Sequence, residues 1–178
     1  MGRTRKYRFC EGCPLDGNPR VFGAGADSPI VFIGQNPGAV ELQLGEPFVG
    51  PAGVRLEKEL WRHGFDRKTD LWITNVVKCW TKGNAVPPDE AVEHCKNYLK
   101  NEWTVGPKIE VVVALGRWAQ KWIRTLVGSG FLYHPDHIVE MTHPSAALRQ
   151  SIYDARFRRE MKEFRENLTI WQLPPGKK

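Results

Sequence analysis

The chain of 178 residues contains 41% hydrophobic and 26% charged residues, proportions typical of a folded globular domain and not of a disordered chain. Its longest uninterrupted apolar run, Val111 to Leu115, is too short to span a bilayer, so we expect no membrane partner. The formal net charge of +6 favours an anionic partner such as nucleic acid.

The basic N-terminus, residues 1–9, is not followed by the apolar segment that would direct secretion, so we expect a cytoplasmic protein in a reducing compartment. The chain is long enough for one domain with a substantial core and too short for two comfortable ones. We therefore predict a monomeric, single domain over residues 1–178, in which residues 174–178 form a loose basic tail.

Four short apolar runs, rich in β-branched residues and bounded by turn-forming residues, predict buried strands. These runs cover residues 29–34, 71–77, 109–115 and 137–141. Segments with the apolar spacing of helices separate or follow them, at residues 54–60, 92–99, 118–126 and 153–168. Because strands separated by helices need crossover connections, we predict an α/β fold: a three-layer α/β/α sandwich around a mostly parallel four-stranded sheet.

Unusual residues occur at three of the predicted strand ends. Gly34-Gln-Asn-Pro-Gly38 follows the first strand, Asn75 lies within the second, and Thr142-His-Pro-Ser145 follows the fourth. Each segment alone is more typical of a turn than of a site. In a parallel sheet, however, ligands bind beyond the carboxyl ends of the strands, so together the three segments predict a shared binding site.

Four cysteines have a spacing that suggests a metal centre. Cys10 and Cys13 are separated by two residues, and Cys79 and Cys95 follow much later in the chain. Four thiolates can bind zinc or an iron–sulfur cluster, and the spacing does not separate the two. Four unrelated buried thiols are the remaining interpretation, because free cysteines are often buried.

The order and content of the motifs resemble those of a known enzyme superfamily. Gly34-Gln-Asn-Pro-Gly38, Gly45-Glu-Pro-Phe-Val-Gly-Pro-Ala-Gly53, Thr74-Asn-Val-Val-Lys-Cys79 and His143-Pro-Ser-Ala-Ala-Leu-Arg149 resemble the uracil-DNA glycosylases. The similarity is greatest to family 4, the iron–sulfur enzymes of bacteria and archaea. It implies that the four cysteines bind a 4Fe–4S cluster, and we expect the role of this cluster to be structural.

The first motif departs from the family 4 pattern. Family 4 usually has an acidic residue followed by a small one where this chain has Gln35 and Asn36. An asparagine in the second place resembles the mismatch-specific uracil/thymine glycosylases instead. Gly38 stands where uracil-selective relatives have a bulky aromatic residue, so exclusion of thymine requires that Glu41 or Leu42 cover the C5 edge of the base.

The resemblance implies a monofunctional DNA-repair hydrolase that flips uracil out of DNA, breaks its N-glycosidic bond and leaves an abasic site. In this interpretation Phe48 stacks on the base, Asn75 hydrogen bonds to its N3–H and O4, and His143 donates to O2. Asn36 holds the attacking water, which makes Asn36 and His143 the catalytic pair. The full set of expected uracil contacts is Gln35, Asn36, Pro37, Phe48, Asn75 and His143.

The last motif is expected to contact DNA through a loop that enters the duplex. Leu148 would fill the space left by the flipped base, and Arg149 would lie near phosphate. The expected DNA contacts are Ser145, Ala147, Leu148 and Arg149. A sliding clamp as a protein partner is left open.

Two alternative functions remain open from the sequence. One is a non-catalytic nucleic-acid-binding protein stabilised by zinc or a cluster, which explains the charge and the cysteines but gives no shared purpose to Asn36, Asn75 and His143. The other is a glycosylase with broader specificity for deaminated or mismatched bases.

Overall fold

A computed structural model describes residues 9–173, so the tail predicted at residues 174–178 lies outside the described part. One five-stranded sheet with the strand order β1-β3-β2-β4-β5 forms the centre of the fold. Strands β2 to β5 run parallel to one another, and β1 pairs antiparallel with β3. The strands are β1 (Ala24–Gly25), β2 (Ile30–Gly34), β3 (Trp72–Asn75), β4 (Val111–Leu115) and β5 (His137–Met141).

The four predicted strands are confirmed, but the predicted strand count is wrong by one. Strand β1 has only two residues, which is too short to produce a periodic sequence signal. It forms because Gly25, with φ +128°, brings its backbone against Leu71: a Cβ there would lie 2.1 Å from the Leu71 carbonyl oxygen. Close backbone approach at a glycine, and not side-chain burial, creates this edge strand.

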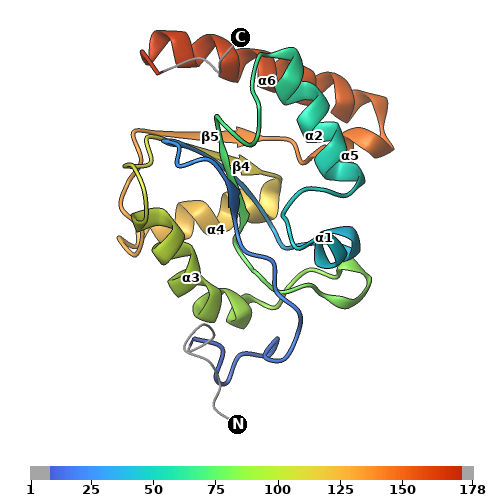
Figure 1. Ribbon diagram of the computed structural model, residues 1–178, viewed down its shortest axis with the longest axis vertical. Helices are drawn as coiled ribbons and strands as arrows, with labels where there is room; N and C mark the ends of the chain where they lie inside the picture. The colour runs from blue at the N-terminus through green and yellow to red at the C-terminus, as the bar shows by residue number, and fades with distance from the viewer. Residues whose placement is uncertain (1–8, 174–178) are drawn as a thin grey trace.

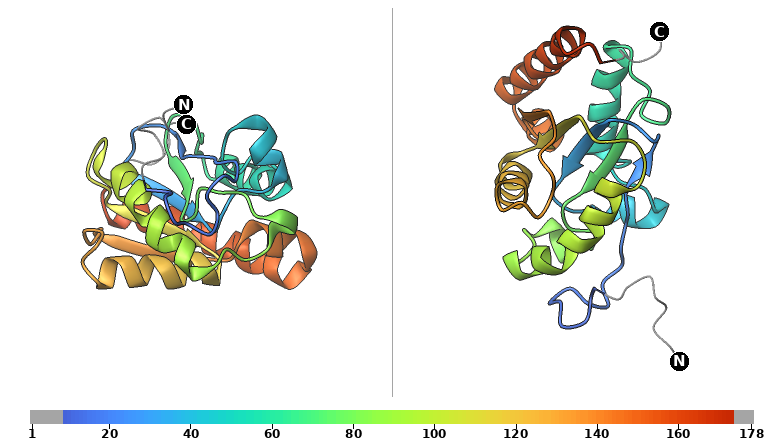
Figure 2. Two further views of the ribbon diagram at one scale, coloured as in Figure 1. Left: turned by 90° about the horizontal axis from the view of Figure 1, so that it is seen from below. Right: turned by 90° about the vertical axis from the view of Figure 1, so that its left-hand side faces the viewer.

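Helices cover both faces of the sheet, which confirms the three-layer α/β/α architecture (Figure 1, Figure 2). Helices α2 and α6 lie on one face, and α3 and α4 lie on the other. The helices are α1 (Ala39–Leu44), α2 (Pro51–Arg62), α3 (Asp89–Thr104), α4 (Arg117–Gly128), α5 (Pro144–Arg149) and α6 (Ser151–Ile170), with a short 3-10 turn η2 (Lys82–Asn84). Within the described residues, none of these helices is both long and apolar enough to cross a membrane.

The alternation of side chains along β2 divides the core into two layers. Val31 and Ile33 pack toward α3 and α4, whereas Ile30 and Phe32 pack toward α2 and α6. All of these side chains are almost completely buried. The strand therefore reads as a continuous apolar run in the sequence because both of its faces are covered.

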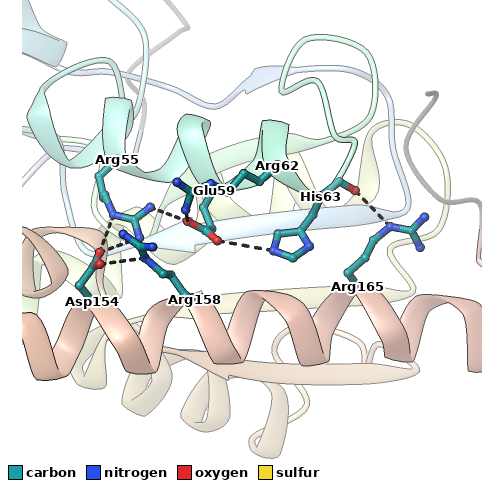
Figure 3. Close-up of polar contacts among 7 residues, drawn as sticks. All are labelled: Arg55, Glu59, Arg62, His63, Asp154, Arg158 and Arg165. Carbon is teal, nitrogen blue, oxygen red and sulfur yellow. Dashed lines mark hydrogen bonds and ion pairs between the residues drawn. The ribbon is translucent and has the colours of Figure 1, made fainter.

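A network of charged side chains joins α2 to α6 (Figure 3). The Arg55 guanidinium contacts Asp154 at 2.7 Å and Glu59 at 2.9 Å, and Glu59 is only 2% exposed. Near the other end of α2, Arg165 donates to the His63 carbonyl oxygen at 3.1 Å. Because α5 directly precedes α6, this network also fixes α5 near the carboxyl ends of the strands.

Candidate active site

Three of the segments expected to carry the chemistry lie at the carboxyl ends of parallel strands. Gln35 and Asn36 follow β2, Asn75 ends β3, and His143 follows β5. Helices α1 and α5, which come after β2 and β5, lie on the same side of the molecule, at the right in Figure 1. This end of the sheet is where the topology of the fold places a ligand site.

Phe48 and Asn75 meet above the backbone of Gly34. A Cβ at residue 34 would lie 2.4 Å from the Phe48 ring and 2.6 Å from the Asn75 side-chain oxygen Oδ1, so glycine is required there. The Phe48 ring also lies near the His143 ring, with centroids 5.8 Å apart. Two of the expected uracil contacts thus meet at Gly34, and a third, His143, lies beside Phe48.

The backbone of the Phe48 segment is held in a conformation that a phenylalanine rarely adopts. Phe48 has φ 54°, in the left-handed region. The buried Arg67 guanidinium donates to the carbonyl oxygens of both Pro47 and Phe48 at 2.5 Å. On the other side, a Cβ at Gly53 would lie 1.8 Å from the Phe48 carbonyl oxygen. Arg67 and Gly53 therefore maintain local strain that sets the direction of the Phe48 ring.

Asn75 is buried, and its side-chain oxygen Oδ1 has no hydrogen-bond partner. Its backbone carbonyl accepts from the Lys78 ammonium at 2.6 Å. Lys78, 1% exposed, also donates to Thr74 at 2.7 Å and to the Glu102 carboxylate at 2.6 Å. This buried ion pair fixes the end of β3. The Asn75 amide oxygen is then available to accept a hydrogen bond from a ligand.

His143 is held as a neutral imidazole with a defined tautomer. Its Nδ1 accepts a hydrogen bond from the Ser145 backbone N–H at 3.1 Å, so in the neutral ring the proton is on Nε2. Burial, assisted by the nearby charge of Arg149, lowers the His143 pKa to about 4. At neutral pH the ring therefore presents an uncharged N–H donor from Nε2.

The Asn36 amide is connected to both of its neighbouring segments. Its nitrogen donates to the Thr81 hydroxyl at 3.0 Å and to the Pro37 carbonyl at 3.3 Å. Its oxygen accepts from the Gln35 amide at 3.2 Å. Gln35 and Asn36 are half-buried, and Pro37 is buried.

Glu41 occupies the space above Gly38. The carboxylate of this buried side chain accepts from the Val49 and Gly50 backbone N–H groups at 3.1 and 2.8 Å. A Cβ at Gly38 would lie 2.6 Å from the Glu41 carboxylate. A bulky side chain at residue 38 is therefore incompatible with this position of Glu41.

The segment expected as a DNA-entering loop is the short helix α5. His143 caps this helix, and proline follows at its first position, which explains why it is helical. Leu148 is 52% exposed and Arg149 is exposed, whereas Ala147 is 7% exposed and packs in the core beneath α5. The Ala147 side chain packs against the core beneath the helix.

All four cysteines are buried, and they lie close enough to interact with one another. Residues 19–21 pair with residues 78–80, which brings the segment containing Cys10 and Cys13 against the one containing Cys79. Cys95 comes from α3, and the same helix supplies Tyr98, whose hydroxyl lies 3.5 Å from the Cys10 sulfur.

The thiols influence one another electrostatically. Burial is the main cause that raises the Cys13 pKa, with Cys95 and Cys10 contributing. A hydrogen bond from Cys79 lowers the Cys95 pKa and raises that of Cys79. Within residues 9–173, no three His, Cys, Asp or Glu side chains are arranged to hold a single metal ion. The all-sulfur donor set matches the ligand chemistry of an iron–sulfur centre.

The sequence analysis did not identify the residues that hold the site in place. Thr81, Arg67 and Glu102 contact Asn36, the Phe48 segment and Lys78 from distant parts of the chain. No spacing pattern in the sequence predicts which residues these three contact. Lys78 lies inside the Thr74–Cys79 motif, so its position in that motif is the one sequence signal that could have drawn attention to its ion pair.

Comparisons with known proteins show the family to which the chain belongs. The family model for the uracil DNA glycosylase superfamily matches residues 22–169. The chain is 31% identical over 182 residues to the type-4 uracil-DNA glycosylase of Archaeoglobus fulgidus, covering 92% of this chain and 90% of that protein. It is 34% identical over 173 residues to the type-4 enzyme of Pyrobaculum aerophilum, covering 87% of each.

The crystal structure of wild-type SMUG2 from Pedobacter heparinus has a similar fold, with a TM-score of 0.57 at 14% identity. The match covers 93% of this chain and 81% of that one. Because the family model spans most of the sequence and nearly full-length relatives exceed 30% identity, the expected resemblance is confirmed: the chain belongs to the uracil DNA glycosylase superfamily.

Proposed function

We propose that this protein excises uracil from DNA by hydrolysing the N-glycosidic bond, leaving an abasic site. The observation that carries the proposal is the buried, unpartnered Asn75 amide oxygen beside the Phe48 ring and the neutral His143. A buried acceptor without a partner is costly, and a ligand N–H in the site would relieve that cost.

Uracil has the complementary set of groups. Its N3–H donates to the Asn75 amide oxygen, its O4 accepts from the Asn75 amide nitrogen, and its face stacks on Phe48. Cytosine lacks the N3–H and has a donor at its C4 position, so both hydrogen bonds would be lost. The Lys78–Glu102 ion pair supports selectivity because it fixes the backbone of Asn75.

His143 stabilises the departing base. As the bond between uracil N1 and the sugar C1′ breaks, its electron pair passes to the uracil ring, and negative charge gathers on O2. The Nε2–H of neutral His143 donates to that oxygen, as in an oxyanion hole. Ser145 supports this role because its backbone N–H fixes the proton on Nε2.

Asn36 holds the water that completes the reaction. The water oxygen forms a bond to C1′ of the cation-like sugar and loses one proton to solvent, while the uracil anion takes up a proton from solvent. A neutral amide has no useful pKa for general-base catalysis, so bond breaking precedes water attack. The Asn36 amide oxygen supplies an acceptor that orients the water.

The exposed Leu148 and Arg149 on α5 support contact with the duplex. Leu148 is a large, exposed apolar side chain on the helix that His143 caps, and it enters the space left by the flipped base. Arg149 lies next to it and binds phosphate.

Cys10, Cys13, Cys79 and Cys95 would hold a 4Fe–4S cluster, and their burial and sulfur chemistry support this assignment. When bound, the cluster supplies iron–thiolate bonds that cross-link the N-terminal segment, the segment after β3 and α3. We assign these cysteines a structural role because none of them is among the expected uracil contacts, although Cys79 ends the motif that contains Asn75. We further infer that the chain acts as one domain, since both core layers pack on one sheet.

The test is a panel of labelled duplexes and single strands, each carrying one uracil, thymine, hypoxanthine or xanthine, with alkali used to reveal abasic sites. We expect release of uracil, and His143→Ala should slow single-turnover excision on the order of a hundredfold. Binding of the uracil duplex, which depends mainly on phosphate contacts, should change little. DNA binding without release of any base would support the non-catalytic alternative instead.

Thymine is the informative comparison within the panel. Gly38 leaves room near the base, but the Glu41 carboxylate fills the space directly above it. We expect uracil to be preferred over thymine and the preference to fall in Glu41→Ala. Equal thymine excision by the unaltered protein would support the broader mismatch specificity.

A further inference from the structure

The Thr81 hydroxyl, in the segment after β3, helps to fix the orientation of the Asn36 amide together with the Pro37 carbonyl oxygen and the Gln35 amide. Thr81 is 6% exposed, and its hydroxyl donates to the Ala85 carbonyl oxygen at 2.6 Å. A threonine hydroxyl has only one hydrogen, so toward Asn36 its oxygen acts as an acceptor. The Asn36 amide group at 3.0 Å from this oxygen must therefore be the nitrogen.

The reversed amide would create three unfavourable contacts. Its oxygen would face the Pro37 carbonyl oxygen and the Thr81 oxygen, whose hydrogen is already used by Ala85, and its nitrogen would face the donating amide of Gln35. Rotating the Thr81 hydroxyl toward Asn36 would leave the Ala85 carbonyl without this donor. The hydrogen bonds of the Asn36 side chain with Thr81, Pro37 and Gln35 therefore all require the same orientation of its amide.

We propose that Thr81 is a positioning residue that directs the Asn36 amide oxygen toward the attacking water. The proposal rests on the function proposed above. The Gln35 amide occupies one acceptor direction of this oxygen, which leaves one for a water O–H. Thr81 itself does not contact the substrate, so it acts only through Asn36.

This pairing accounts for the departure in the first motif. The amide nitrogen of Asn36 needs a nearby group that can only accept a hydrogen bond. Thr81, 45 residues later in the segment that follows β3, supplies this acceptor. The Thr81 hydroxyl oxygen acts only as an acceptor toward Asn36 because its hydrogen is donated to the Ala85 carbonyl oxygen. Valine at residue 81 would keep the shape and remove the acceptor.

The experiment is a double-mutant cycle of single-turnover uracil excision with the wild type, Thr81→Val, Asn36→Ala and the double variant. We expect Thr81→Val to be slowed about three- to tenfold, the equivalent of one hydrogen bond. In the Asn36→Ala background the same substitution should have no further effect, and Thr81→Ser should retain the wild-type rate. Affinity for a uracil duplex, measured by fluorescence anisotropy, should stay the same in all four proteins.

Thr125→Val is the matched control. The Thr125 hydroxyl also donates to a backbone carbonyl, at 2.9 Å, but it is exposed on α4. We expect the wild-type rate for this variant. A wild-type rate in Thr81→Val, or an equal slowing by Thr81→Val with and without Asn36, would overturn the proposal. Absence of uracil release by the wild type would instead overturn the proposed function.

A spectroscopic measurement tests the pairing without reference to activity. The side-chain amide resonances of Asn36 can be assigned by NMR from their loss in Asn36→Ala. The chemical shifts of these resonances should change in Thr81→Ala and stay the same in Thr81→Ser. Thr81→Ala also replaces Thr81→Val in this test if the valine variant does not fold. Unchanged resonances in Thr81→Ala would contradict the hydrogen bond.

Discussion

The low pKa of His143 predicts a specific loss of stability in mild acid. The ring has a pKa of about 4 in the folded protein and an ordinary value of 6.5 when exposed. Below pH 6.5 the unfolded chain therefore binds a proton that the folded protein does not, and folding becomes less favourable as the pH falls. The loss is nearly absent at pH 7 and reaches its full size below pH 4.

The two pKa values give the size of the effect. Between pH 7 and pH 5, burial of a neutral His143 should lower the free energy of unfolding by about 2 kcal/mol. Arg55 lowers the pKa of Asp154, and the stability that this carboxylate contributes is lost as the pH falls through its own, more acidic range. The contribution of Asp154 to the pH dependence of stability is the same in the wild type and in variants that differ only at residue 143, so it cancels when they are compared.

The assay is urea unfolding of the wild type and His143→Gln at pH 7 and pH 5. We expect the decrease between the two pH values to be about 2 kcal/mol smaller in His143→Gln. His134→Gln, at an exposed histidine, is the control and should keep the wild-type decrease. Equal decreases in the wild type and His143→Gln would refute the burial of a neutral imidazole at the site.

Three further perturbations follow from the contacts described above. Cys95→Ser should lose iron and the visible absorbance of the cluster and unfold at a lower temperature; full iron content measured by elemental analysis would contradict the ligand assignment. Arg67→Gln should release the Phe48 segment and slow single-turnover uracil excision about tenfold or more; an unchanged rate would show that Phe48 holds its position without the clamp. Leu148→Ala should slow excision from duplex DNA more than from single strands, because only a duplex leaves a gap to fill; equal effects on both substrates would argue against insertion.

The sequence determined the layers of the fold and the end of the sheet that carries the site. Runs such as Val111 to Leu115 are apolar on both faces, which is a local property that requires helices above and below. The segments around Asn36, Asn75 and His143 directly follow or end such runs, so parallel topology alone places them together. The cysteine spacing and the motif order pointed to the same superfamily that the comparisons confirmed.

The tertiary structure decided the features that depend on contacts between distant residues. Strand β1 exists because a glycine approaches Leu71, and the last motif forms a helix in which Ala147 faces the core. Thr81 helps to fix the orientation of the Asn36 side-chain amide, and Arg67 holds the strained backbone of Phe48. A periodic pattern reports which side of an element is buried, but it does not report which donor meets which acceptor. Those pairings arise only when the folded chain brings separate segments within hydrogen-bond distance.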